Sequence, residues 1–162
     1  MEKLELNLTY EIYEWEELSK HDQELLEKAY EATYNAYAPY SQFFVGAAVR
    51  LQNGSIYIGN NQENAAYPSG ICAERNALFH VGAIGKAKEI EAIAICVRTS
   101  IAKIEQPIFP CGACRQVMLE YEQIVQKPIR VLMQGQTGKV LISKGIENFL
   151  LPLVFKLPKN GE

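Results

Sequence analysis

The stretch Pro110-Cys111-Gly112-Ala113-Cys114 sets two thiols three positions apart, and Cys72-Ala73-Glu74 adds a third thiol two positions before a carboxylate. Residues three apart lie on one face of a helix, so a helix that begins near Cys111 brings Cys111 and Cys114 to one metal ion. Three protein ligands leave the fourth position of a tetrahedral zinc ion open to water, as in catalytic sites. The pattern therefore predicts a hydrolytic Zn²⁺ centre held by Cys72, Cys111 and Cys114 at the starts of two helices.

Glu74 follows Cys72 by two positions, so its side chain points elsewhere within the same turn and lies beside the metal. Zinc can lower the pKa of bound water from about 15.7 to about 7. A carboxylate beside that water can take its proton and pass it to a leaving amine, a step typically worth about 10²–10⁴-fold. Three thiolates leave an excess negative charge, which Arg75 or Arg115 could offset by donating hydrogen bonds to the sulfurs.

A closed structural zinc site, serving assembly and not catalysis, is the alternative interpretation of the three thiols. It needs a fourth ligand, and the remaining nitrogen and sulfur candidates are His21, His80 and Cys96. His80 lies eight residues after Cys72, about 12 Å along a helix, which is too far to share one ion. Cys96 falls within an apolar strand and is typical of a small buried hydrophobe. An acid such as Glu74 has no purpose beside a closed site, which favours catalysis.

Composition excludes several classes of protein. The chain has 162 residues with a net charge of −3, of which residues 1–31 contribute ten acids and three lysines. The sequence contains no basic stripe of Lys and Arg of the kind that tracks a phosphate backbone, which argues against nucleic-acid binding. The start, Met1-Glu2-Lys3-Leu4-Glu5, lacks the basic and apolar regions of a signal peptide, and apolar runs such as 93–97 are too short to span a membrane. We therefore expect a cytoplasmic protein whose thiols stay reduced.

Alternation of strands and helices predicts an α/β fold, a three-layer α/β/α sandwich around a mixed sheet of about five strands with an extra N-terminal strand. We expect residues 1–20 to form an extension and residues 21–162 a single domain. Period-two alternation predicts a strand over 3–13, and the β-branched run at 90–97 a central buried strand. The remaining expected elements are helices over about 22–37, 71–83 and 111–124 and strands over 45–51, 55–59, 129–133 and 140–143, with a hairpin turn at Asn53-Gly54.

Together these motifs resemble the cytidine deaminases of the small homotetrameric type. The resemblance covers roughly residues 22–155 and rests on segments 38–48, 61–67, 72–75, 110–116 and 150–152. It implies hydrolytic deamination of cytidine and deoxycytidine to uridine and deoxyuridine plus ammonia, in pyrimidine salvage. Zinc-bound hydroxide would attack C4 while Glu74 shuttles the proton. It also implies a homotetramer with a nucleoside substrate and no nucleic-acid or membrane partner.

The resemblance further implies roles for residues around the metal. Asn61 and Glu63 match the pair that holds the ribose 3′-hydroxyl, Phe43 matches an aromatic of the base pocket, and Ala73 matches a substrate contact. Tyr67 and Phe155 match aromatic residues near subunit contacts. A bound 3′-hydroxyl leaves no room for a polymer chain, which favours a free nucleoside over nucleic-acid editing. Another cytosine nucleoside, such as the antibiotic blasticidin S, is the alternative substrate.

Three departures from the family pattern affect the shape of the expected pocket. Phe44 stands where a Pro is common, Gln62 replaces an aliphatic residue, and Leu153-Val154 replaces small residues before Phe155. They concern the pocket wall and the reach of Phe155, and leave the zinc chemistry untouched.

Overall fold

The computed structural model describes residues 1–156, so residues 157–162 of the expected domain lie outside the described part. It contains a mixed six-stranded sheet in the order β1-β6-β5-β4-β2-β3, in which β4 and β5 are parallel and the other neighbours antiparallel. The principal elements are β1 (Glu11–Tyr13), α1 (Lys20–Ala32), β2 (Phe44–Leu51), β3 (Ile56–Asn60), α2 (Ala73–Ala83), β4 (Ile90–Arg98), α3 (Gly112–Val125), β5 (Arg130–Met133) and β6 (Val140–Ser143).

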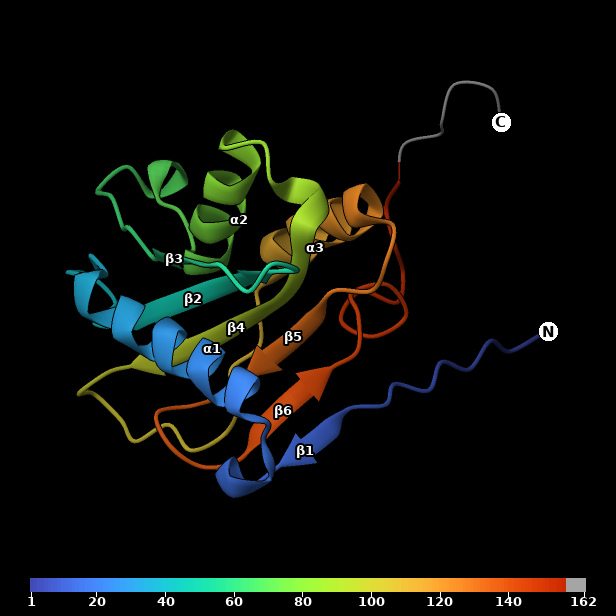
Figure 1. Cartoon of the computed structure of the whole chain (residues 1–162), viewed down its shortest axis with the longest axis horizontal. Helices are drawn as coiled ribbons and strands as arrows, with labels where there is room; N and C mark the ends of the chain where they lie inside the picture. The colour runs from blue at the N-terminus through green and yellow to red at the C-terminus, as the bar shows by residue number, and fades with distance from the viewer. Residues whose placement is uncertain (157–162) are drawn as a thin grey trace.

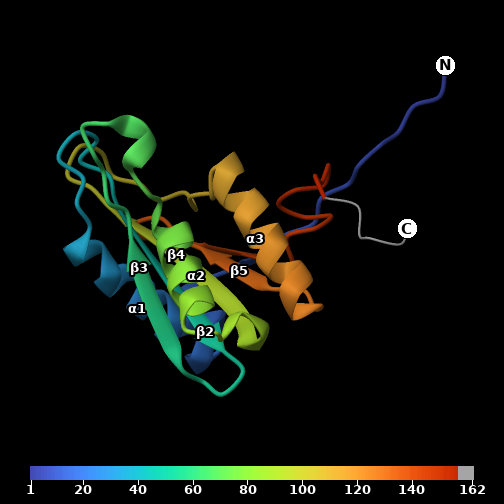
Figure 2. The same ribbon diagram turned by 90° about the horizontal axis from the view of Figure 1, so that it is seen from above.

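Helices cover both faces of the sheet, as the two views show (Figures 1 and 2). One buried cluster joins the sheet to α1 through Leu25 and Leu26, and a second joins its other face to α2 and α3 through Leu78 and Met118. Strand β4 is central and buried along most of its length, as its near-continuous apolar run predicts. The expected three-layer α/β/α sandwich with an added N-terminal strand is therefore confirmed.

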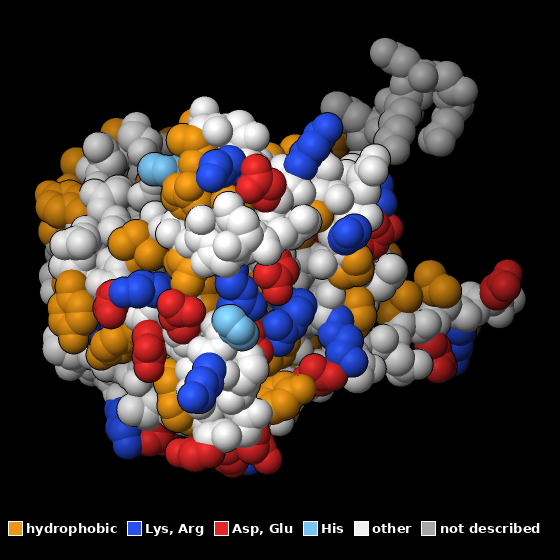
Figure 3. All heavy atoms as spheres, viewed as in Figure 1, with side chains coloured by type: hydrophobic (Ala, Val, Ile, Leu, Met, Phe, Trp, Pro, Cys, Tyr) orange, Lys and Arg blue, Asp and Glu red, His pale blue; other side chains and the backbone are white. Residues whose placement is uncertain are grey.

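The strand expected over residues 3–13 is wrong for most of its length, because only Glu11–Tyr13 pair with a neighbour. Their partner β6 has four residues, so the ladder ends there and offers the preceding residues no hydrogen bonds. Leu4, Leu6 and Leu8 lie exposed, and the chain start extends away from the body (Figures 1 and 3).

The first helix ends earlier than its apolar pattern predicts. It begins after Ser19, whose hydroxyl accepts the Asp22 N–H at 3.1 Å, and gives way to a 3₁₀ turn over Thr33–Asn35. The buried Thr33 hydroxyl donates to the Tyr30 carbonyl at 2.7 Å, which satisfies it locally and favours the tighter turn. Tyr37 therefore lies outside the helix, where its backbone bridges to Gln62.

Candidate active site

The three cysteines of the sequence motif meet at the N-terminal ends of α2 and α3. Cys72 and Cys111 are the N-cap residues of these helices, and Cys114 lies one turn into α3. Their Sγ atoms all lie within 4.8 Å of one another, with Cys72 and Cys111 4.0 Å apart. Thiolates about 2.3 Å from a tetrahedral zinc ion lie about 3.8 Å from one another, so the cluster fits that metal.

No fourth Cys, His, Asp or Glu joins this group within residues 1–156. His80 lies near the end of α2, and Cys96 is buried in β4, where burial raises the pKa of its thiol to about 12. A closed four-ligand site is thus not formed by these side chains, and a metal held here keeps one position open to the adjoining cavity.

Arg75 supplies positive charge to the thiols. Its Nη2 lies 3.7 Å from Cys72 Sγ, and its buried Nε has no partner among the described residues. The pKa of Cys72 is lowered to about 5, first by a hydrogen bond from Cys114 and then by the Arg75 guanidinium, although burial opposes ionisation. A thiol that ionises readily at a helix N-terminus is a ready metal ligand.

Arg115 does not contact the sulfurs. Its Nε donates to the Pro110 carbonyl at 2.8 Å and its Nη1 to the Leu150 carbonyl at 3.2 Å. It therefore fastens the loop before α3 to the C-terminal segment, and of the two arginines that follow site residues only Arg75 reaches a thiol.

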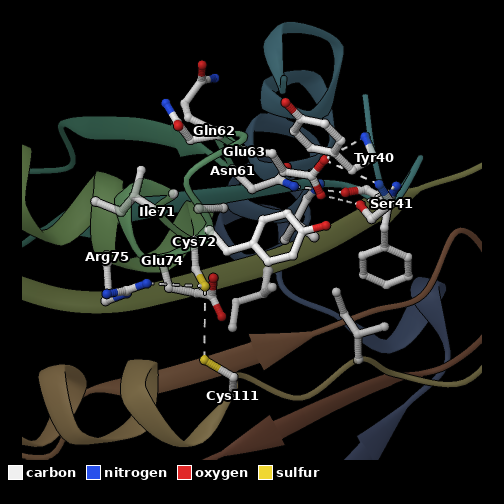
Figure 4. A pocket seen from close by; sticks show the side chains of 18 of the residues that line it. Tyr40, Ser41, Asn61, Gln62, Glu63, Ile71, Cys72, Glu74, Arg75 and Cys111 are labelled. Carbon is white, nitrogen blue, oxygen red and sulfur yellow. Dashed lines mark hydrogen bonds between the residues drawn. The ribbon is translucent and has the colours of Figure 1, made fainter. Parts of the chain in front are cut away.

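Glu74 lies beside the cysteine cluster at the base of the cavity, with its side chain facing the Cys72 sulfur (Figure 4). It is only 5% exposed. Burial raises the pKa of its carboxyl to about 6, and the neighbouring Cys72 thiolate acts in the same direction. A carboxyl with a pKa near neutrality can both accept and release a proton at cellular pH.

A cavity of about 800 Å³ connects this cluster to Phe43, Asn61, Glu63, Tyr67 and Ala73, all of which line it. Figure 4 shows Cys72, Cys111 and Glu74 at one end and Glu63 at the other. The sequence therefore identified residues from both ends of one cavity. Phe155 is the exception, because it is 67% exposed and does not line the cavity in this chain.

Asn61 ties the loop after β3 to the start of β2. Its Oδ1 accepts the Val45 N–H at 2.8 Å and its Nδ2 donates to the Phe43 carbonyl at 2.9 Å. These two bonds hold Phe43 against the cavity, and the second amide N–H of Asn61 is left over from this pairing.

Glu63 is held by a segment that the sequence alone did not identify as functional. Its carboxylate accepts the N–H groups of Tyr40 and Ser41 at 2.9 and 3.2 Å, and also the Ser41 hydroxyl. Burial opposes ionisation, but these hydrogen bonds hold the pKa of Glu63 below its usual range. Tyr40 and Ser41 lie within segment 38–48, which carries part of the family resemblance, so the resemblance was the signal that could have identified them.

The sequence of this chain is similar to those of known deaminases. Residues 19–128 match the family described as the cytidine and deoxycytidylate deaminase zinc-binding region. A cytidine deaminase of Halalkalibacterium halodurans is 40% identical over 133 residues, covering 82% of this chain and 92% of that protein. A probable cytidine deaminase of Dictyostelium discoideum is 37% identical, covering 74% of this chain and 83% of that protein.

Solved structures agree with these sequence matches. The crystal structure of a cytidine deaminase from Burkholderia pseudomallei has a TM-score of 0.71 at 40% identity, covering 85% of this chain and 100% of that chain. The crystal structure of a cytidine deaminase from Mycobacterium tuberculosis has a TM-score of 0.61 at 29% identity, covering 83% of this chain and 96% of that chain.

Within residues 1–156, no helix combines the length and apolar character needed to cross a membrane.

Proposed function

This chain belongs to the cytidine deaminase family, and we propose that it hydrolyses free cytidine and deoxycytidine to uridine and deoxyuridine with release of ammonia, as in pyrimidine salvage. The observation that carries the proposal is the buried Glu74 carboxyl beside three converging thiols at the end of a nucleoside-sized cavity. The names of the relatives support cytidine as the substrate, and the cavity lining supports a small molecule.

Cys72, Cys111 and Cys114 would hold a zinc ion, which when bound supplies Lewis-acid activation of a water molecule. Glu74 takes a proton from the attacking water and delivers it to the amine that leaves C4 of the base. Its elevated pKa suits both directions of transfer, and its burial keeps bulk water from competing. Arg75 offsets the negative charge of the thiolates through its contact with Cys72.

At the other end of the cavity, Glu63 would accept a hydrogen bond from the ribose 3′-hydroxyl and Asn61 would donate one through its remaining N–H. Phe43, held by Asn61, packs against the base. Ala73 is fully buried at the first position of α2, where a larger side chain would fill the floor of the cavity. This arrangement favours a free nucleoside, because an enclosed 3′-hydroxyl leaves no exit for a polymer.

We also propose a homotetramer, in which the exposed Tyr67 and Phe155 contact neighbouring subunits. These side chains are 80% and 67% exposed in the single chain, which leaves both accessible to another subunit. Sedimentation equilibrium gives four times the chain mass if the tetramer forms, and the mass of one chain contradicts it.

Product chromatography after incubation of the zinc-loaded protein with cytidine, deoxycytidine and blasticidin S in parallel tests the function. Uridine and deoxyuridine are the expected products. Conversion of blasticidin S alone moves the substrate to another cytosine nucleoside. Absence of every product, with one zinc bound per chain by elemental analysis, favours a structural zinc module instead.

A further inference from the structure

The Ser41 hydroxyl lies between the two groups expected to hold the sugar and the base. It donates to Glu63 Oε1 and accepts the Phe43 N–H at 3.1 Å (Figure 4). The intervening Gln42 has a φ of 55°, and its N–H donates to the Ala38 carbonyl at 3.0 Å. The hydroxyl therefore sits inside a tight turn that carries Phe43 on one side and contacts Glu63 on the other.

The hydrogen bonds of the Glu63 carboxylate can be counted. An ionised carboxylate offers about four acceptor positions on its two oxygens. Oε2 receives the Tyr40 and Ser41 N–H groups, and Oε1 receives the Ser41 hydroxyl. One position remains, on Oε1, the oxygen whose orientation the Ser41 hydroxyl fixes.

We propose that Ser41 is a positioning residue for substrate recognition: its hydroxyl orients Glu63 Oε1 toward a sugar hydroxyl and couples that oxygen to the turn that presents Phe43. The inference rests on the proposed function, since it deepens the role given there to Glu63. It adds a residue that contacts neither the thiol cluster nor Glu74.

Removal of the hydroxyl leaves the two backbone N–H groups on Oε2 and frees Oε1, while the exposed Phe43 N–H can donate to water in place of Ser41. The carboxylate stays charged and in place, but the oxygen that faces the sugar loses its fixed direction. The effect therefore falls on binding of the sugar hydroxyl and leaves the proton transfer at Glu74 unaffected. Hydrogen bonds to charged groups are among the stronger ones in proteins.

The test compares Ser41→Ala and Ser41→Thr with the wild type on cytidine and on 3′-deoxycytidine. Ser41→Ala is expected to raise KM for cytidine about tenfold, the scale of one hydrogen bond to a charged group, with kcat nearly unchanged. On 3′-deoxycytidine, which lacks the relevant hydroxyl, the same variant is expected to change KM by less than about twofold. Ser41→Thr keeps the hydroxyl and is expected to resemble the wild type on both substrates.

Ser55→Ala, in the β2–β3 hairpin turn, is the matched control for loss of a serine hydroxyl. If Ser41→Ala raises KM equally for both substrates, Ser41 has a merely structural role and the proposal is overturned. An unchanged KM for both substrates also overturns it. If the wild type itself has the same KM for both substrates, Glu63 does not hold the 3′-hydroxyl and the proposal falls while deamination stands.

A measurement that does not need turnover separates the two proposals. Carbon-13 NMR titration of the Glu63 carboxyl is expected to give a higher pKa in Ser41→Ala than in the wild type, because one stabilising donor is lost. Identical pKa values overturn the positioning role even if no nucleoside is deaminated. If the wild type turns over no nucleoside but the two pKa values differ, only the proposed function is refuted.

Discussion

Replacement of Glu74 by Gln is expected to lower the rate of deamination strongly and, in the metal-free protein, to raise the free energy of unfolding near neutral pH. Burial raises the pKa of Glu74 from its ordinary 4.5 to about 6. The folded state therefore binds the proton more tightly than the unfolded state does. Stability falls as pH rises through this window, because ionising a carboxyl with only 5% exposure is unfavourable.

The magnitude follows from the shift. One pKa unit corresponds to about 1.4 kcal/mol, so the rise to about 6 costs the folded protein about 2 kcal/mol once Glu74 is fully ionised. Gln has nearly the same shape and no charge. Metal-free Glu74→Gln is thus expected to be more stable than the metal-free wild type by about 2 kcal/mol at about pH 8, and equally stable at about pH 4.

Urea unfolding of both metal-free proteins at the two pH values measures the difference, and turnover of the zinc-loaded proteins measures the activity. Activity is expected to fall by at least about 10²–10⁴-fold with zinc content unchanged. A variant that is no more stable than the wild type at the higher pH refutes the burial argument. A variant that deaminates cytidine as fast as the wild type refutes the role of Glu74 as proton carrier.

Three further outcomes are expected. Arg75→Gln lowers activity or zinc affinity about 10–100-fold, as loss of a partner to a metal ligand does, whereas Arg115→Gln lowers chiefly the melting temperature. Asp22→Ala lowers the free energy of unfolding by about 1–3 kcal/mol in urea titrations, because Arg130 loses its carboxylate and buried Arg50 keeps only one carboxylate partner, Glu91 at 3.5 Å. In the wild type, burial raises the pKa of Asp22, but hydrogen bonds from Arg130, Ser19 and Arg50 outweigh it and hold this pKa below its usual 3.8. The stabilisation of the fold by these contacts is therefore complete above about pH 3.8 and is lost as the pH falls through the lowered pKa. Gly59→Ala destabilises the fold by about 1–3 kcal/mol by overpacking and reduces activity, since the added methyl would lie 2.4 Å from the Ala77 nitrogen of α2; unchanged turnover in that variant contradicts a fixed α2 position.

The chemistry-bearing end of the site was predictable from the sequence because its residues are grouped within two short segments. Cys72 and Cys111 each precede a helix, and the helical repeat brings Cys114 to the same face as Cys111. The two candidate arginines could not be separated by spacing. Arg75 follows the N-cap Cys72 by three positions and Arg115 follows the N-cap Cys111 by four, and both spacings place the side chains on one helix face.

The Glu63 end could not be derived in this way, because its contacts join segments far apart in the chain. Ser41 and Glu63 are 22 residues apart, and the β2–β3 hairpin and the bridge between Tyr37 and Gln62 bring them together. The error over residues 3–10 has a related cause. Alternation describes a strand that could pair, whereas pairing depends on the length of the neighbouring strand, here the four residues of β6.

The two ends of the cavity also differ in what supports them. The thiol end rests on helix starts that pack into the core, where Ala73 and Cys114 are fully buried and leave no room for change. The opposite end rests on turns held by side-chain hydrogen bonds, so substitutions there can be accommodated by new contacts. Phe44 lies with its ring 4.4 Å from the Arg98 guanidinium, and Gln62 donates to Asn60 at 2.6 Å. Variation at this end can therefore retune the fit of the sugar and base without disturbing the proton transfer at Glu74.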